Sequence, residues 1–266
     1  MKVLAFNYMK LSLAIILMVI AITSEPFAGE AVYTNPPLAS NGTLHVPSEE
    51  YPTIQAAIDA SADGDTILVA PGTYKGYGNR DLYIQGRSIV LKSELGPELT
   101  VIDCEGSTGN THTGLSIFYD TTGGVVVDGF TIRRAYGDPD YNNAGIYLYS
   151  SHSIIRNCIF ESNTLHGAYC SSSNPIINNC VFAGNSGYFG GGLYCYNSSP
   201  TLTGCLFDGN SAQYGGAIYY YSTSAAYLMN CTFVNNSAKY GGGIYISTGA
   251  VKGWSSISNC IIAFSS

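Results

Sequence analysis

Much of the chain after residue 126 consists of short runs in which apolar and polar residues alternate, and Gly, Asn and Ser separate these runs. Alternation with a period of two is typical of β-strands, and the runs are too short for helices. Five runs align on a central cysteine, and the first four end in asparagine; they span residues 154–163, 176–185, 201–210, 227–236 and 256–262. A less regular copy at 126–135 has Phe130 in place of the cysteine. The repeat length of roughly 25 residues predicts one turn of a solenoid.

A second repeating unit lies between these runs, and in it glycines precede alternating aliphatic and aromatic residues. Its copies occupy residues 144–150, 190–196, 215–221 and 241–247, and a shorter copy begins at His166. Each repeat predicts a strand, an asparagine-containing corner, a loop, a glycine-rich corner and another strand, which is the pattern of a parallel β-helix. A single coil cannot bury its own apolar face, so we expect about eight coils to stack. The predicted fold class is all-β.

Alternation also assigns side chains to the inside of the predicted solenoid. Two inward columns hold the repeated cysteines and phenylalanines, namely Cys158, Phe160, Cys180, Phe182, Cys205, Phe207, Cys231 and Phe233. Further inward positions are Ile146, Ala168, Leu193, Ile218, Ile244, Cys170 and Cys195. We interpret the cysteines as small buried apolar residues, and the spacing of stacked coils leaves disulfides open. No CxxC motif and no His at ligand spacing indicates a metal site.

One corner of the repeat contains an asparagine in four successive coils: Asn163, Asn185, Asn210 and Asn236. Asn tolerates the left-handed backbone conformation that tight corners need, and stacked amides can hydrogen-bond to one another. We therefore predict a structural ladder at this corner, with left-handed asparagines.

The N-terminal part divides into three segments. Residues 1–31 predict a signal peptide, because Lys2 and Lys10 precede an apolar stretch that is too short to span a bilayer comfortably. A linker at 32–43 leads to an N-terminal cap and first coil at 44–74, where a short helix that opens at Thr53 covers the end of the solenoid. Residues 75–266 form the repeats. The chain stops just after an inward strand, so we expect further sequence beyond Ser266 and regard the repeat domain as truncated.

The chain carries few charged residues and a negative net charge, which argues against a nucleic-acid partner. The chain has 11 Lys and Arg against 18 Asp and Glu, for a net charge of −7. Beyond Arg156 the basic residues are Lys239 and Lys252, so the sequence contains no basic stripe for phosphates. We expect no nucleic-acid partner and no transmembrane helix in the mature chain, which we place outside the cytoplasm, either secreted or at the cell surface.

Two sets of motifs resemble known families. Residues 46–74 (VPSEEYPTIQAAIDASADGDTILVAPGTY) are similar to the N-terminal cap of exported right-handed β-helix proteins of the pectate-lyase type. GGAI at 215–218 and the tetrapeptides FESN, FAGN, FDGN and FVNN resemble the GGA(I/L/V) and FxxN repeats of polymorphic outer-membrane proteins. The resemblance covers most of residues 44–266. It implies a right-handed β-helix with the pectin lyase fold, displayed at the cell surface or cell outer membrane for adhesion. It is less specific for function, because this fold also hosts lyases, hydrolases and esterases.

Carboxylates are too sparse to predict a catalytic centre. A lyase needs a cluster of carboxylates that holds Ca²⁺, and a glycosidase needs two carboxylates that flank the glycosidic bond to be cleaved. The repeat alignment stacks Arg156 on Asp128 and Glu161 on Arg133, which predicts surface ion pairs. Arg134 is left without a partner in this alignment. We therefore assign no catalytic residue.

Two more segments deserve a chemical interpretation. Asp138 and Asp140 alternate with other residues in a way that could supply oxygen ligands to Ca²⁺, but the Gly and Glu of a calcium loop do not follow, and we favour an ordinary polar loop. His166 precedes a glycine, as in polygalacturonases, but their paired aspartates have no counterpart here, and we interpret it as a surface histidine. We assign no metal site and no cofactor, and leave bound Ca²⁺ open.

Tyrosines form the most regular feature of the predicted outer surface. Five outward positions in consecutive coils are tyrosine: Tyr147, Tyr169, Tyr194, Tyr219 and Tyr245. A partial second column contains Tyr149, Tyr196 and Tyr221. Stacked rings stabilise neighbouring strands, and an exposed strip of them would also suit sugar rings or a protein partner. We expect a flat, exposed aromatic strip and take its five tyrosines as candidate ligand-binding residues.

Two functions remain open. The first is an exported, non-catalytic β-helix domain that serves as an adhesin or carbohydrate-binding module for an extracellular polysaccharide or a host or cell-surface protein. The alternative is a polysaccharide-active enzyme, most naturally a Ca²⁺-dependent, pectate-lyase-like polysaccharide lyase, with its site in the irregular coils at residues 103–142.

Overall fold

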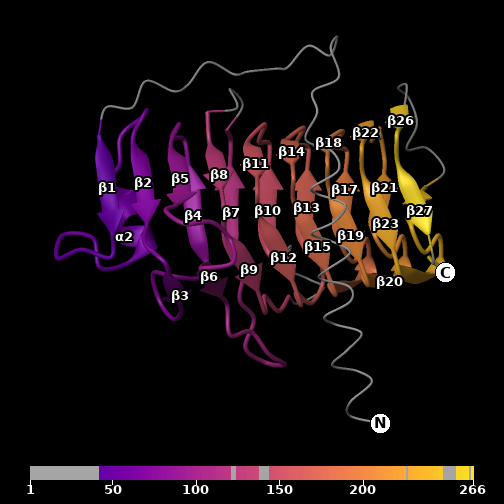
Figure 1. Cartoon of the computed structure of the whole chain (residues 1–266), viewed down its shortest axis with the longest axis horizontal. Helices are drawn as coiled ribbons and strands as arrows, with labels where there is room; N and C mark the ends of the chain where they lie inside the picture. The colour runs from indigo at the N-terminus through magenta and orange to yellow at the C-terminus, as the bar shows by residue number, and fades with distance from the viewer. Residues whose placement is uncertain (1–41, 121–123, 138–143, 226, 248–255, 264) are drawn as a thin grey trace. The chain divides into compact units, whose positions relative to one another are not determined.

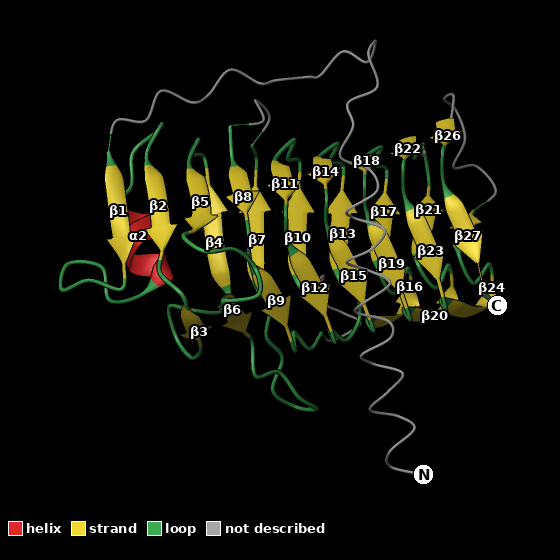
Figure 2. Cartoon of the chain, viewed as in Figure 1, coloured by secondary structure: helices red, strands yellow, loops and turns green. Residues whose placement is uncertain are grey.

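The described part of the chain is a stack of β-strand coils in the computed structural model (Figures 1 and 2), which describes residues 42–120, 124–137, 144–225, 227–247, 256–263 and 265–266. Its strands form three long parallel sheets and one short parallel sheet. We number the nine-, seven-, eight- and three-stranded sheets 1 to 4 in that order. In each regular coil the chain passes from sheet 1 to sheet 3 and then to sheet 2, so these three sheets are the walls of the solenoid. The predicted all-β parallel solenoid of about eight turns is confirmed.

Sheets 1 and 2 run along the whole stack. Sheet 1 contains β1 (Thr43–Val46), β2 (Thr66–Val69), β5 (Val90–Ser93), β8 (Val126–Asp128), β11 (Ile154–Arg156), β14 (Ile176–Asn178), β18 (Thr201–Thr203), β22 (Tyr227–Met229) and β26 (Ser256–Ser258). Sheet 2 contains β4 (Leu82–Gln85), β7 (Leu115–Phe118), β10 (Ile146–Tyr149), β13 (Ala168–Ser171), β17 (Leu193–Tyr196), β21 (Ile218–Tyr221) and β25 (Ile244–Ile246).

Sheet 3 completes the solenoid, and sheet 4 is a short addition to three of the later coils. Sheet 3 contains β3 (Gly72–Tyr74), β6 (Thr100–Asp103), β9 (Thr131–Arg133), β12 (Ile159–Glu161), β15 (Val181–Ala183), β19 (Leu206–Asp208), β23 (Thr232–Val234) and β27 (Ile261–Ala263). Sheet 4 contains β16 (Ser186–Phe189), β20 (Ser211–Tyr214) and β24 (Ser237–Tyr240). These strands were not predicted from the sequence.

The register of the strands places equivalent repeat positions one above another. Phe160, Phe182, Phe207 and Phe233 pair in succession, are fully buried, and stack with ring centroids 4.6–5.1 Å apart. The repeated cysteines form the adjacent column, because each one's carbonyl accepts a backbone hydrogen bond from the coil above, as from Val181 to Cys158. Cysteines 158, 180, 205 and 231 are buried, and all eight cysteines of the chain are free thiols. The inward placement of both columns is thus confirmed.

The asparagine ladder is also present, with a different backbone from the one expected. Each side-chain amide donates to the next asparagine oxygen, for example from Asn163 Nδ2 to Asn185 Oδ1 at 3.0 Å. The prediction of left-handed asparagines was wrong, because the positive φ belongs to the preceding residue, as in Ser162 (54°) and Gly184 (60°). The turn is completed one residue earlier, so the asparagine is free to point inward and bond the buried backbone.

The N-terminal end of the stack carries a helix, α2 (Ile54–Ala60), beside β1 and β2 (Figure 2). Thr53 is its N-cap, and the Thr53 side chain accepts a hydrogen bond from the Ala56 N–H. Ile54 and Ile58 are buried against the first coils. The predicted capping helix therefore covers the end of the core, where open strands would otherwise invite association. Within the described residues, no helix is both long and apolar enough to span a membrane.

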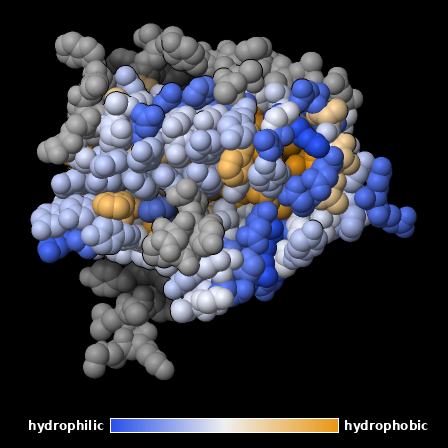
Figure 3. Space-filling model, turned by 180° about the vertical axis from the view of Figure 1, so that it is seen from behind, coloured by the Kyte–Doolittle hydropathy of each residue, from blue (hydrophilic) through white to orange (hydrophobic). Residues whose placement is uncertain are grey.

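Figure 3 shows that the described surface on the side opposite to Figure 1 is mostly hydrophilic, with hydrophobic residues gathered in small separate areas. Low charge is therefore compatible with a polar surface, because Ser, Thr, Asn and Tyr take the place of Lys and Glu.

Candidate functional site

The five candidate tyrosines do lie in one column on the outer face of sheet 2. In-register strand pairing joins Tyr147 to Tyr169, and the pairing continues through Tyr194 and Tyr219 to Tyr245. Neighbouring rings are close, with centroids 4.7 Å apart for Tyr169 and Tyr194. This column, named here the inner aromatic column, follows directly from the repeat length and the alternation of the strands.

The expected exposure of the inner aromatic column was wrong. Tyr147, Tyr169 and Tyr219 retain only 8%, 7% and 5% of their surface. A second layer of rings lies against the column: Phe189 of β16 stacks on Tyr219 at 4.8 Å, and His166 contacts Tyr194 at 5.3 Å. Burial raises the pKa of Tyr169 to about 12, with a smaller opposing effect from its hydrogen bond with Ser171. These tyrosines are therefore mainly packing residues.

His166 is a second correction. It was expected at the surface, but its ring is buried between Tyr169 and Tyr194, and its Nδ1 lies 3.1 Å from the Gly190 carbonyl oxygen. Burial lowers the His166 pKa to about 4, although the hydrogen bonds with the backbone at Gly190 and Phe189 oppose this effect. The residue is neutral at physiological pH and belongs to the aromatic packing layer.

Exposed rings occur instead in the partial second column of sheet 2. Tyr196 and Tyr221 are 40% and 43% exposed and stack with centroids 5.6 Å apart. In register with them, Tyr149 and Phe118 lie 6.1 Å apart at the N-terminal end, and Ser171 occupies the coil between the two pairs. We call Phe118, Tyr149, Tyr196 and Tyr221 the outer aromatic column. Phe118 was missed in the sequence because its coil lacks the cysteine and asparagine markers of the repeat.

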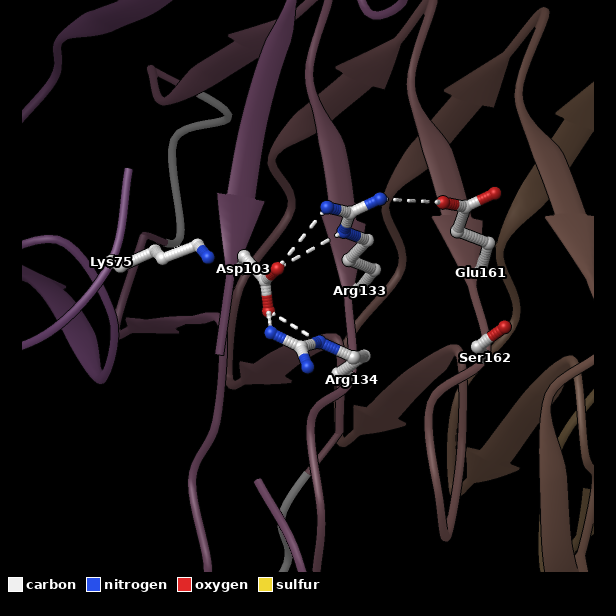
Figure 4. A pocket seen from close by; sticks show the side chains of 6 residues that line it. All are labelled: Lys75, Asp103, Arg133, Arg134, Glu161 and Ser162. Carbon is white, nitrogen blue, oxygen red and sulfur yellow. Dashed lines mark hydrogen bonds and ion pairs between the residues drawn. The ribbon is translucent and has the colours of Figure 1, made fainter. Parts of the chain in front are cut away.

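A charged depression of about 450 Å³ lies on the outer face of sheet 3 (Figure 4). It is lined by Lys75, Asp103, Arg133, Arg134, Glu161 and Ser162. Figure 4 shows that Arg133 lies between the two carboxylates and that the Lys75 side chain extends toward Asp103. The charged residues follow from strand register, because β9 pairs with β6 on one side and with β12 on the other.

Asp103 is the centre of this depression. Its side chain is 1% exposed, and it accepts hydrogen bonds from Arg133 Nε at 3.2 Å and from Arg134 Nε at 2.6 Å. Burial raises the Asp103 pKa, but the hydrogen bond from Arg134 and the backbone N–H of Glu105 outweigh it, so the pKa lies below its usual value. The carboxylate is therefore ionised, and each of its two oxygens accepts a hydrogen bond from an arginine.

The ion pairs expected from the repeat alignment are confirmed, with one correction. Arg156 and Asp128 approach to 3.0 Å, and Arg133 and Glu161 to 3.8 Å. The prediction that Arg134 lacks a partner was wrong, because its guanidinium is 2.5 Å from Asp103. Asp103 precedes the regular repeats, so the alignment did not reveal that it lies one coil below.

One His–Asp pair was not found from the sequence. His112 Nδ1 lies 2.7 Å from Asp81 Oδ2, and the other oxygen of Asp81 accepts the Thr113 N–H. The pair ties together the loops that follow β3 and β6. Asp81 thus binds the His112 ring with one oxygen and the Thr113 backbone with the other, which gives this pair a structural role.

The described residues contain no group of three or more His, Cys, Asp or Glu side chains that could hold a metal ion. The candidate calcium ligands Asp138 and Asp140 lie outside the described residues. The signal peptide at 1–31 and most of the linker also lie outside them.

Stacked coils, inward aliphatic and aromatic columns and an asparagine ladder define this protein as a parallel β-solenoid. A family model described as "right handed beta helix region" matches residues 88–264, and the chain belongs to this family. No curated protein matches the chain. The resemblance to the repeats of polymorphic outer-membrane proteins stays a prediction.

Solved structures that are similar in fold come from two enzyme classes. Pectate lyase Pel9A has a TM-score of 0.44 and 16% identity, with 84% of this chain and 79% of that chain covered. Pectin methylesterase PemA from Erwinia chrysanthemi has a TM-score of 0.41 and 13% identity, covering 78% and 80%. A pectin methylesterase in complex with a hexasaccharide has a TM-score of 0.40 and 14% identity, covering 78% and 80%.

Proposed function

We propose that this protein is an exported, non-catalytic β-helix module that binds an extracellular polysaccharide along the outer face of sheet 2. The observation that carries the proposal is the outer aromatic column, in which Tyr196 and Tyr221 present stacked, exposed rings from adjacent coils. A tyrosine offers a rigid apolar face together with a hydroxyl group, which suits the face and the hydroxyls of a sugar ring.

The inner aromatic column lies beside this surface on the same face of sheet 2. Tyr219 stacks beside Tyr221 at 6.1 Å, and Tyr147 lies 6.4 Å from Tyr149. Buried neighbours restrict the exposed rings, so little conformational entropy is lost on binding. The candidate ligand-binding tyrosines thus keep a place in the proposed site, as the layer that positions the contact rings.

The spacing of the rings in the outer aromatic column favours an extended ligand, with Tyr196 and Tyr221 exposed and Phe118 and Tyr149 half-buried. The Phe118–Tyr149 pair and the Tyr196–Tyr221 pair are separated by the coil of Ser171, so the nearer rings of the two pairs are about 10 Å apart along the stack. A polymer that lies along the solenoid axis can contact both pairs at once, and simultaneous contact strengthens binding without any new interaction.

The lyase alternative has weaker support. Asp103 and Asp128 lie in the region where a lyase site was expected, and both carboxylates already accept hydrogen bonds from arginines. Asp120 accepts the N–H groups of Gly124 and Val125 and the Ser153 hydroxyl. Carboxylates in such positions hold the coils together rather than bind Ca²⁺ or a proton.

The test is a double substitution, Tyr196→Ala with Tyr221→Ala, assayed on an array of immobilised neutral and acidic polysaccharides. We expect binding to weaken about tenfold, since each ring contributes a central contact. Tyr227→Ala is the matched control, because Tyr227 is similarly exposed, at 38%, on sheet 1.

Three outcomes would contradict the proposal. The first is unchanged binding by a double variant whose circular dichroism spectrum is that of the wild type. The second is the release of unsaturated sugar products, read by ultraviolet absorbance with Ca²⁺ present, since that would identify a lyase. Binding to protein but to no polysaccharide on the array would also reject the ligand class.

A further inference from the structure

We propose that the charged depression on sheet 3 is a second binding site, separate from the outer aromatic column, and that it takes a single oxyanion group. The ligand is a carboxylate or a sulfate, either as a free ion or as a substituent of a polysaccharide. Lys75, Arg133 and Arg134 are the residues that would contact it.

The depression has an excess of positive charge. The depression holds three cationic side chains and two carboxylates, Asp103 and Glu161, so its lining is net positive in a chain whose net charge is −7. The Asp103 side chain is 1% exposed, whereas those of Arg133 and Arg134 are 36% and 48% exposed. The Glu161 side chain, at 38%, is as exposed as that of Arg133. Both guanidinium groups therefore reach solvent, and Asp103 is the carboxylate that lies buried beneath them.

Some of the hydrogen-bond donors in the depression are free to bind a ligand. Asp103 bonds Nε and one terminal nitrogen of Arg134, and within the described residues the other terminal nitrogen has no hydrogen-bond partner. The Lys75 ammonium group likewise has no ion-pair partner there. Because Asp103 fixes the Arg134 guanidinium, its remaining donors are held in place before a ligand arrives, whereas the other terminal nitrogen of Arg133 faces Glu161 at 3.8 Å. A guanidinium with a free edge and a nearby ammonium is the usual set of donors for an oxyanion.

The backbone at Arg134 directs its side chain into the depression. Consecutive residues of an extended chain normally point to opposite faces, yet Arg133, the last residue of β9, and Arg134, which follows the strand, both reach the same carboxylate. Arg134 does so because its φ is +55°, in the left-handed region. Equivalent corners in the regular coils are occupied by smaller residues, such as Ser162, Gly184 and Gly209. A non-glycine residue in this conformation raises the conformational free energy of the backbone. The same conformation brings two guanidinium groups together at one site.

The size of the depression limits the ligand. A volume of about 450 Å³ is within the range of small-molecule sites and accommodates a monosaccharide unit with its acidic substituent. The lining offers donors on one side and no extended apolar wall. The recognised feature is therefore the anionic group rather than a whole sugar ring.

The experiment compares Lys75→Gln and Arg134→Gln with two matched controls. Lys92→Gln removes an exposed lysine from β5, and Arg156→Gln removes an arginine that is paired with a carboxylate and is 46% exposed, close to the 48% of Arg134. The probes are sodium sulfate, a polyuronate, a sulfated polysaccharide and a neutral polysaccharide, measured by calorimetry at low, constant ionic strength.

We expect Lys75→Gln and Arg134→Gln each to weaken binding of the anionic probes roughly fivefold, which corresponds to one charged contact. The two controls should bind like the wild type. Binding of sulfate alone would identify a free anion as the source, whereas binding of one charged polymer would identify its substituent. No binding of any anionic probe, or equal losses in Lys75→Gln and Lys92→Gln, would overturn the site.

This outcome can be separated from that of the proposed function. The variant with Tyr196→Ala and Tyr221→Ala leaves the depression intact. It should therefore bind sodium sulfate with the affinity of the wild type, and its depression on sheet 3 should still bind the anionic polymer. Loss of sulfate binding in that variant would contradict the independence of the two sites.

Discussion

Burial determines the chemistry of His166. Its position before a glycine predicted a surface residue, but the chain at Phe189 and Gly190 folds against it from the next coil. No local pattern around residue 166 reports this contact, because it depends on how β16 packs. The result is a neutral imidazole among tyrosine rings, and it has a consequence for stability.

His166 should make the protein less stable in mild acid. Its pKa falls from 6.5 to about 4 on folding, so between these values the unfolded state binds more protons than the folded state. Stability from this residue is complete above about pH 6.5, declines as the pH falls, and has lost about 3 kcal/mol below pH 4. Urea unfolding at several pH values measures this slope.

The control for this prediction is His166→Gln, which removes the titrating group and leaves every other one in place. The difference between the two stability curves isolates His166, since groups such as Asp103 titrate in both proteins. Parallel curves between pH 4 and 6.5 would show that the histidine is not buried as described.

At the scale of the element, the asparagine ladder links coils that are far apart in the sequence. Asn185 accepts hydrogen bonds from both the backbone and the side chain of Asn163 at 3.0 Å. It also donates to the Phe160 carbonyl and to the next asparagine, Asn210, at 2.9 Å each. The ladder is fully buried, so each of these groups needs its partner.

Asn185→Ala should therefore cost about 3 kcal/mol, because it leaves several buried donors and acceptors without partners. Asn178→Ala is the control, since Asn178 lies on the outer face of β14 and belongs to the same coil. Denaturant unfolding followed by circular dichroism compares the two. Equal effects of the two substitutions would mean that the ladder contributes no more than an ordinary surface amide.

Much of the element-level structure could be predicted, for a simple physical reason. Strand alternation and a constant repeat length fix which residues are stacked, so the Phe column, the Cys column and the inner aromatic column were all correctly placed. The left-handed residue was displaced by one position, because sequence does not separate Asn185 from its neighbour Gly184 as the residue that turns the chain. Small polar residues and glycine suit either place.

At the scale of the whole molecule, the candidate sites depend on contacts between different coils and sheets. The repeat gave the position of Tyr219 but not its burial, since Phe189 reaches it from sheet 4. Likewise, the partner of Arg134 lies in an irregular coil without the cysteine and asparagine markers. Exposure and ion pairing are properties of the assembled stack, which explains why register was predictable and the identity of the exposed rings was not.

The thiols offer a measurement of that stack as a whole. Burial raises the pKa of Cys180, Cys195 and Cys205, and reaction with a disulfide reagent requires an accessible thiolate. Cys260, in the last coil, is the one cysteine that is not fully buried. The native protein should therefore react rapidly at Cys260 alone, and all eight thiols should react in denaturant without reductant.

Cys260→Ser supplies the control for thiol labelling, because it should abolish the rapid native reaction and leave seven thiols for the denatured protein. The slow labelling of the interior cysteines then reports the opening of coils, since each cysteine is covered by the coils above and below it. Fewer than eight thiols in the unreduced, denatured wild type would reveal disulfides between stacked coils. Rapid native labelling of Cys180 or Cys205 would show that the cysteine column is not part of a closed core, and the register on which both proposed sites depend would fail with it.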